Sequence, residues 1–155
     1  MAVSGPAYDI VEVLHVASAV VAFGSLAATG RYSSSLRQRA DPLSDASARR
    51  YFKPGRNWAE WSLFLVPVFG GTLVGMGGAA IADHAWPWIG LGIWLAAAGA
   101  ATGGVFPAER RIQESLAACT DVAAIRLSAR TCERWSAVTS VLFVAALVVM
   151  VWQPA

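Results

Sequence analysis

Glu12 and His15 are the first residues whose types and spacing suggest chemistry. They lie three positions apart in IVEVLHVASAVVAFGSLAATG, residues 10–30, which is otherwise almost entirely apolar. Residues at positions i and i+3 share one face of a helix. Ionisable side chains within a membrane segment usually face the interior of a bundle or a cavity. The pair therefore predicts a polar site on one face of the first helix.

Imidazole ligates haem iron, copper or zinc, and it exchanges protons near neutral pH. We therefore expect His15 to ligate haem b or a copper ion, with Glu12 as the residue that orients or neutralises the ring. Two alternatives stay open from the residues alone. The pair could move protons, or it could be a structural pair without any ligand.

Further candidate ligands are expected near the same level. His15 lies about five residues into its segment, roughly 8 Å deep, and we expect Met76 and Trp94 at comparable depths. Thioether sulfur suits copper(I) or an axial position on haem. The second histidine, His84, falls in a connection on the same side. The predicted cofactor-binding residues are His15, Glu12, Met76 and Trp94, and the predicted metal ligands are His15, His84 and Met76.

Each additional candidate also has an ordinary structural interpretation. Met76 and Trp94 would serve equally as packing residues, and His84 as a solvated loop residue. The sequence has no Ser/His/Asp set, P-loop or HExxH motif. It therefore predicts no catalytic residue and leaves enzymatic activity undecided.

Four apolar segments must position these side chains. The chain of 155 residues is 56% hydrophobic and 14% charged, whereas a soluble domain is about 25% charged. A helix needs roughly 20 mostly apolar residues to cross a bilayer, and residues 10–29, 61–82, 88–106 and 136–152 satisfy this requirement. We expect an all-α protein, a four-helix transmembrane bundle that forms one integral membrane domain over residues 1–155.

The positions of the basic residues predict the topology. All 12 Lys and Arg residues fall between the first and second segments or between the third and fourth. The positive-inside rule then places residues 31–60 and 107–135 in the cytoplasm and both termini on the outer side. These arginines flank membrane segments and form no nucleic-acid-binding motif. We expect a multi-pass membrane protein with its basic connections in the cytoplasm, with the lipid bilayer as its partner and no nucleic acid.

The connections carry weaker signals. Residues 31–60 are rich in Ser, Asp and Pro in their first half, which indicates irregular structure there. Pro107 suits the first turn of a new helix. Thr120 or Asp121 can cap a further helix that runs through Arg134 into the fourth segment. Cys119 and Cys132, placed in the cytoplasm, are expected to stay reduced.

Two pairs of glycines are spaced for close helix packing. Gly71 and Gly75 form one pair, and Gly99 and Gly103 form the other, as in small-xxx-small contacts between membrane helices. These contacts could hold the bundle together, clear room for a flat ligand, or join the chain to a second copy or a larger membrane complex. Pro67 is expected to kink the second segment.

The stretch LHVASAVVAFGSLAATG resembles the opening of an uncharacterised family of predicted bacterial integral membrane proteins. In that family a Leu-His pair begins the first helix and a Phe-Gly or Trp-Gly pair follows, at positions matching Leu14, His15, Phe23 and Gly24. The likeness continues through RRYFKPGRNWAEWSLFLVPVFG and WPWIGLGIWLAAAGAATGGVFPAERRIQ, and the chain looks like an actinobacterial version. This group is similar to the membrane domain of copper resistance protein D and to HemJ-type protoporphyrinogen oxidases, which implies a copper-related or haem-related role for His15.

A second stretch, RRYFKPGRNWAEWSLFL, resembles the start of the second helix in membrane-associated glutathione transferases. The matching positions are Arg49 or Arg50, Asn57 and Glu60. The resemblance implies that these residues bind a thiol conjugate on the cytoplasmic side. The leading hypothesis is a protein that holds haem or copper through His15 near the outer face. The alternatives are a non-catalytic structural or assembly subunit of a membrane complex, and a glutathione-transferase-like enzyme.

Overall fold

The computed structural model describes residues 5–39, 41–55, 61–119 and 121–153, and within these residues the chain is helical with no strand. The long helices are α1 (Pro6–Gln38) and α8 (Val122–Trp152). Between them lie η1 (Pro42–Ser44), α2 (Ala46–Tyr51), η2 (Ser62–Phe64), α4 (Leu65–Gly77), α5 (Ala79–Ala82), α6 (Trp86–Ala100), the π-helical segment η3 (Ala101–Val105) and α7 (Phe106–Ala117). The predicted all-α class is confirmed.

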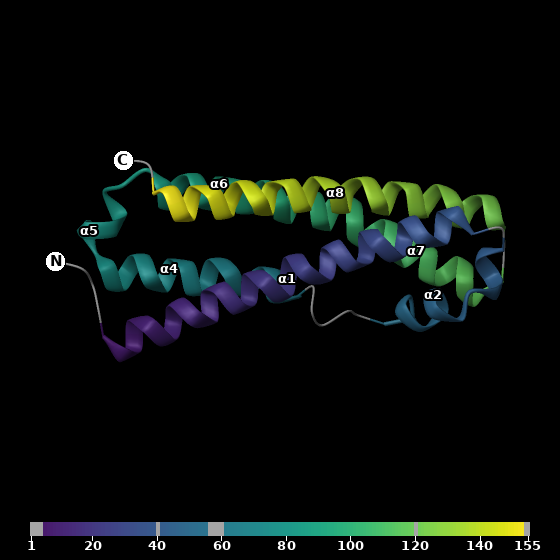
Figure 1. Ribbon diagram of the computed structural model, residues 1–155, viewed down its shortest axis with the longest axis horizontal. Helices are drawn as coiled ribbons and strands as arrows, with labels where there is room; N and C mark the ends of the chain where they lie inside the picture. Colours follow the sequence, from purple (N-terminus) through teal and green to yellow (C-terminus); the bar gives the residue numbers. More distant parts are fainter. Residues whose placement is uncertain (1–4, 40, 56–60, 120, 154–155) are drawn as a thin grey trace.

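The helices run side by side in an elongated bundle (Figure 1). Helix α8 packs along α1, and its other faces contact α6 and α7. Helix α4 packs mainly on the first half of α1, with few contacts to α6. Both ends of the chain lie at the same end of the bundle, and α2 lies at the opposite end (Figure 1).

Three helical stretches have the length and hydropathy of membrane spans: Pro6–Gln38, Trp86–Ala117 and Val122–Trp152. The apolar stretch Ser62–Gly77 is shorter, because Gly78 has a φ of +56° and interrupts the helix before α5. Glycine adopts this conformation without steric cost. The prediction of a single helical span over residues 61–82, kinked at Pro67, is therefore wrong, because α4 ends at Gly77. The chain has the character of a membrane protein.

Two predicted boundaries also change. Helix α1 continues to Gln38, because Ser33 and Leu36 stay buried in the bundle, so the prediction of irregular structure directly after residue 30 is wrong. Pro107 lies in the first turn of α7, as predicted, but α7 is not a separate helix. The π-helical turn η3 joins α6 to α7 within the continuous stretch from Trp86 to Ala117. Proline has no N–H to donate to the preceding turn, and a π-helical turn has a different pattern of backbone hydrogen bonds from an α-helix.

The predicted continuity of the last helix is confirmed. Asp121 caps α8 by accepting a hydrogen bond from the backbone N–H of Ala123 at 2.8 Å, and the helix runs through Arg134 to Trp152. Thr120, the alternative cap, lies outside the described residues.

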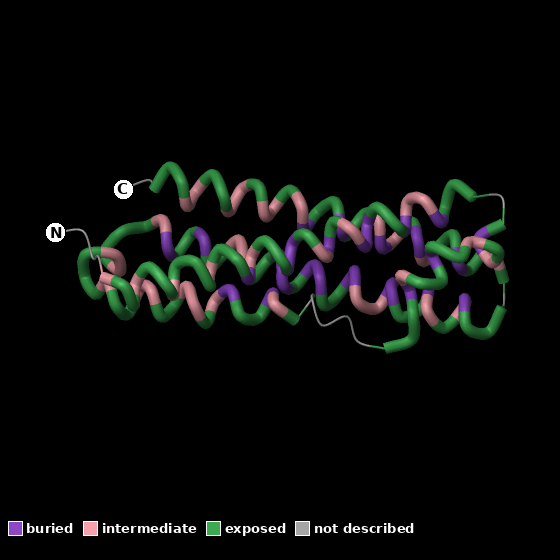
Figure 2. Tube along the Cα trace, turned by 60° about the horizontal axis from the view of Figure 1, so that its bottom comes forward, coloured by how far each residue is buried: buried purple, intermediate pink, exposed green. Residues whose placement is uncertain are grey.

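The two ends of the bundle differ in burial. We call residues 6–20, 65–96 and 140–152 the terminal half, since they lie toward the chain ends, and residues 21–55, 61–64, 97–119 and 121–139 the basic half. In the terminal half the buried residues described are Ser18, Val66, Pro87 and Gly90. The hydrophobic core lies instead in the basic half (Figure 2), and its fully buried side chains include Leu26, Leu36, Leu63, Ile112 and Ile125.

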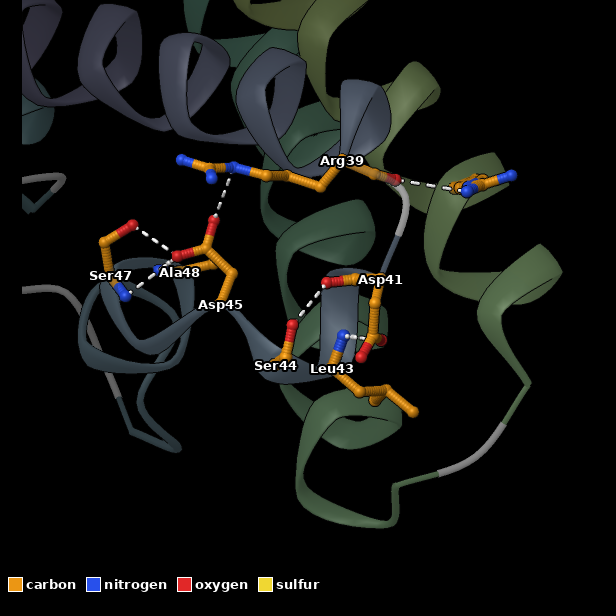
Figure 3. A network of polar contacts seen from close by, with 8 residues as sticks. Arg39, Asp41, Leu43, Ser44, Asp45, Ser47 and Ala48 are labelled. Atoms are coloured by element: carbon orange, nitrogen blue, oxygen red, sulfur yellow. Dashed lines mark hydrogen bonds and ion pairs between the residues drawn. The ribbon is translucent and has the colours of Figure 1, made fainter.

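Polar contacts organise the connection between α1 and α2 (Figure 3). Asp41 accepts a hydrogen bond from the backbone N–H of Leu43 at 3.0 Å. Asp45 caps α2 by accepting from the backbone N–H groups of Ser47 and Ala48, and it forms an ion pair with Arg39 at 3.2 Å. This network fixes the turn by which the chain leaves α1.

Candidate functional site

The half-buried side chain of His15, on α1, contacts the backbone of α4. Its Nδ1 is 2.9 Å from the carbonyl oxygen of Val66. A carbonyl oxygen only accepts hydrogen bonds, so Nδ1 carries the proton. In the neutral ring Nε2 then has a free lone pair, which is the tautomer that a metal ligand at Nε2 requires.

Gly70 makes room for this ring. A Cβ atom at residue 70 would lie 3.0 Å from Cε1 and 3.3 Å from Nδ1 of His15. Such distances are shorter than ordinary van der Waals contact between carbon atoms. The absence of a side chain at Gly70 therefore allows α1 to approach α4 closely enough for the hydrogen bond from His15 to Val66.

Trp94 also donates to the backbone of this region, from α6. Its Nε1–H donates a hydrogen bond of 2.9 Å to the carbonyl oxygen of Leu63. In a regular helix that carbonyl would accept from residue 67, but residue 67 is proline and has no N–H. Trp94 therefore satisfies an acceptor that Pro67 leaves open, and it connects α6 to the start of α4.

The structure does not bring the predicted site residues to one level. His15 contacts Gly70, whereas Met76 lies six residues further along α4, about 9 Å away along the helix axis. Trp94 contacts the carbonyl oxygen of Leu63, three residues or about 4.5 Å along the helix from the Val66 carbonyl that His15 contacts. The prediction of a common depth is therefore wrong for Met76, because the sequence did not reveal how α1 and α4 are staggered.

The remaining predicted residues are exposed. Glu12 is exposed, and the hydrogen bond described for His15 goes to Val66 rather than to Glu12. His84 is exposed in the turn between α5 and α6, and Met76 is 41% exposed. Within the described residues no three His, Cys, Asp or Glu side chains group to hold a metal ion. His15 is thus the one predicted ligand that the fold orients.

The glycine pairs occupy unexpected positions. Gly71, Gly75, Gly99 and Gly103 are exposed, and a Cβ atom at any of them would have no neighbour within 4 Å. The prediction that these pairs pack helices together is wrong within this chain. The close approaches occur at other glycines, which the spacing did not single out: Gly30 against Ser136, Gly70 against His15, Gly90 against Met150 and Gly104 against Trp135.

The residues matched to glutathione transferases are only partly described. Asn57 and Glu60 lie outside the described residues. Arg49 donates a hydrogen bond to the Sγ atom of Cys119 at 3.2 Å, and Arg50 is exposed. Neither Cys119 nor Cys132 forms a disulfide within the described residues.

No protein-family model, curated protein or solved structure matches this chain. The resemblances drawn from the sequence therefore stay predictions.

Proposed function

We propose that this chain is a multi-pass protein of the bacterial cytoplasmic membrane that binds haem b through His15. The observation that carries the proposal is the hydrogen bond from Nδ1 of His15 to the Val66 carbonyl oxygen at 2.9 Å. Histidines that ligate metals almost always donate their other ring N–H to a carbonyl, a carboxylate or water. This contact fixes both the tautomer and the orientation of the ring.

The number of ligands favours haem over a copper ion. A porphyrin supplies four nitrogen ligands, and a single histidine is sufficient to hold its iron in many proteins. A copper site built by the protein needs several side chains, whereas Met76 and His84 lie away from the level of His15 along the chain. Copper is therefore the alternative metal, and the experiment below distinguishes the two.

The glycines of α4 leave little side-chain bulk beside His15, which suits a flat ligand. The Val66 carbonyl and Gly70 hold the imidazole, while Gly71 and Gly75 present open space on the same helix. Bound haem would supply one-electron redox chemistry. The chain itself would contribute an oriented imidazole and a surface with few polar groups.

The topology rests on charge. Both termini lie at the end of the bundle opposite α2 (Figure 1). All 12 Lys and Arg residues fall within residues 31–56 and 110–134. The positive-inside rule then assigns the end of the bundle that carries α2 to the cytoplasmic side, and the opposite end, nearer to His15, to the outer side. Reporter fusions at residue 45 and at the C-terminus test this: activity of a cytoplasmic reporter at the C-terminus would contradict it.

The two histidines of the chain provide the central experiment. The full-length protein is expressed with haem supplementation and purified in mild detergent, and its reduced-minus-oxidised absorption spectrum is recorded together with its iron and copper content. We expect a haem signal in the wild type and in His84→Ala, and at least a tenfold loss in His15→Ala. A colourless, iron-free wild type would contradict haem binding. Stoichiometric copper in the wild type that is lost in His15→Ala would show that the ligand of His15 is copper and not haem.

A second candidate function is that of a structural or assembly subunit. The observation that favours it is the exposed pair Gly99 and Gly103, where an added Cβ atom would meet no described neighbour within 4 Å. Small residues of this kind let membrane helices approach closely. Two results together would support this function instead. The wild type would carry no haem or metal, and a protein that co-purifies with it would be lost in Gly99→Leu.

A further inference from the structure

A cleft of about 540 Å³ lies between Gly55, Trp61 and Phe64 on one side and residues of η3 and α7 on the other. Three aromatic side chains line it: Trp61, Phe64 and Phe106. Charged side chains of the next helical turns, Arg110, Arg111 and Glu114, line it as well. The cleft thus combines an apolar part with a charged part, and it is separate from the surroundings of His15.

The position of the cleft corresponds to the surface of a bilayer. From Trp86 to Val105 the helix has 20 residues, which span about 30 Å at 1.5 Å per residue, the thickness of the hydrocarbon core. Phe106 therefore lies at the boundary of that core. Arg110 and Arg111, one turn further on, lie at the level of lipid headgroups on the basic side.

The charges of the cleft are available for a ligand. Within the part of the chain that the structure describes, the side chains of Arg110, Arg111 and Glu114 make no hydrogen bond or ion pair. Glu109 differs, because it is buried and accepts a hydrogen bond from Gln113 at 3.3 Å. The two guanidinium groups equal in number the carboxylates of Glu109 and Glu114 that line the same cleft. Neither guanidinium group is engaged by a carboxylate within the described residues, and guanidinium groups bind phosphate oxygens well.

The backbone beside the cleft is also unusual. Thr102 lines the cleft and belongs to the π-helical segment η3, where its hydroxyl donates to the carbonyl oxygen of Ala98 at 2.8 Å. Single π-helical turns inside α-helices occur frequently at functional sites. This turn connects the membrane part of the helix to the turns that carry the two arginines.

We propose that this cleft binds the phosphate group of a phospholipid from the leaflet on the basic side. The guanidinium groups of Arg110 and Arg111 hold the phosphate, and Trp61, Phe64 and Phe106 contact the glycerol and the upper acyl chains. The depth of the site favours a lipid over a soluble phosphate ester, because a lipid presents its phosphate at this level.

Native mass spectrometry of the full-length protein tests the proposal. The protein is purified in mild detergent and mixed with phosphatidylglycerol, with phosphatidylethanolamine, or with diacylglycerol, which has no phosphate. We expect the wild type to retain one phospholipid and no diacylglycerol. The variant Arg110→Gln/Arg111→Gln should retain at least tenfold less, whereas Arg130→Gln/Arg134→Gln, which removes two exposed arginines of α8, should retain as much as the wild type.

The opposite results are equally clear. Equal retention by the two double variants, or retention of diacylglycerol, would overturn the proposal. Displacement of the phospholipid by inorganic phosphate would assign the site to a soluble phosphate ester and overturn the lipid source. If the double variant does not fold, as judged by circular dichroism, Arg111→Gln alone carries the test, and Glu114→Gln should retain at least as much lipid as the wild type.

Discussion

The basic half and the terminal half are built from the same long helices, but they bury their side chains differently. In the basic half Leu26, Leu36 and Ile125 are fully buried. In the terminal half Leu95 of α6 is 58% exposed and Val144 of α8 is 59% exposed. The basic half therefore has a hydrophobic core of its own, whereas the terminal half presents its apolar side chains outward, as expected where lipid surrounds a protein.

The difference extends to how the helices are joined. In the terminal half, the contact of α4 with α1 includes a side-chain hydrogen bond to a backbone carbonyl, from His15 to Val66. In the basic half, α1 and α8 are joined by buried apolar contacts and by the ion pair between Arg37 and Glu133 at 2.9 Å. We therefore expect substitutions in the basic half to affect stability more strongly.

The largest effect is expected in the core of the basic half. Ile112→Ala removes a fully buried side chain of α7 and should lower the free energy of unfolding by about 3 kcal/mol. Leu95→Ala, in the exposed face of α6, should cost less than about 0.5 kcal/mol. Unfolding of both variants in a titration of denaturing detergent measures the difference, and equal losses would contradict the contrast between the halves.

A pair of glycines gives the next effect. At Gly30 a Cβ atom would lie 2.6 Å from Cβ of Ser136, so Gly30→Ala should separate α1 from α8 and destabilise the protein by about 2 kcal/mol. At Gly71 a Cβ atom has open space, and Gly71→Ala should be neutral or stabilising by up to about 1 kcal/mol. Thermal unfolding followed by circular dichroism compares them. A destabilised Gly71→Ala would show that another chain occupies that face.

The cap of α2 should contribute less. Asp45→Ala removes the acceptor for two backbone N–H groups and should cost about 1 kcal/mol, whereas Asp83→Ala in the exposed turn of the terminal half should cost nothing. The hydrogen bond from the Ser47 hydroxyl holds the pKa of Asp45 below its ordinary value. The contribution of the cap is therefore complete above the ordinary pKa of about 3.9 and is lost as the pH falls through the lower value. An unchanged melting temperature in Asp45→Ala would contradict this.

The smallest effect is expected at the ion pair between α1 and α8. Burial alone would raise the pKa of Glu133, but the hydrogen bonds from Arg37 and Ser34 lower it overall. The pair therefore stabilises the protein above the ordinary glutamate pKa of about 4.3 and less at lower pH. Because both side chains are partly exposed, Glu133→Gln should cost only about 0.5 kcal/mol at neutral pH. Glu12→Gln serves as the control, and an equal loss there would mean that the ion pair contributes nothing specific.

The sequence predicted the elements better than their contacts. Apolar length located the long helices. Asp121, one of the two predicted caps, does cap α8, and such a cap can be predicted because it depends on neighbouring residues. The extension of α1 to Gln38 was missed because it depends on burial against other helices. The helix break at Gly78 was missed because the apolar pattern continues across it and glycine is compatible with either conformation.

The candidate site was predicted less well for a related reason. Its two side-chain hydrogen bonds end on the backbone carbonyls of Leu63 and Val66, and every residue has such an acceptor. Pro67 was the one available signal, because it leaves the Leu63 carbonyl without its helical donor. Which glycines face a neighbouring helix depends on the rotation of each helix about its own axis, so the spacing of Gly71 and Gly75 did not reveal it.

Helix α1 has a mechanical consequence. It runs without a break from His15 to Arg37, 22 residues or about 33 Å, and sharp bends in helices need a proline, a bulge or an inserted group. A tilt imposed where His15 meets α4 would therefore be transmitted along a stiff rod to the ion pair with Glu133. The two ends of the bundle are connected through this rod, so a displacement at one end has a direct route to the other.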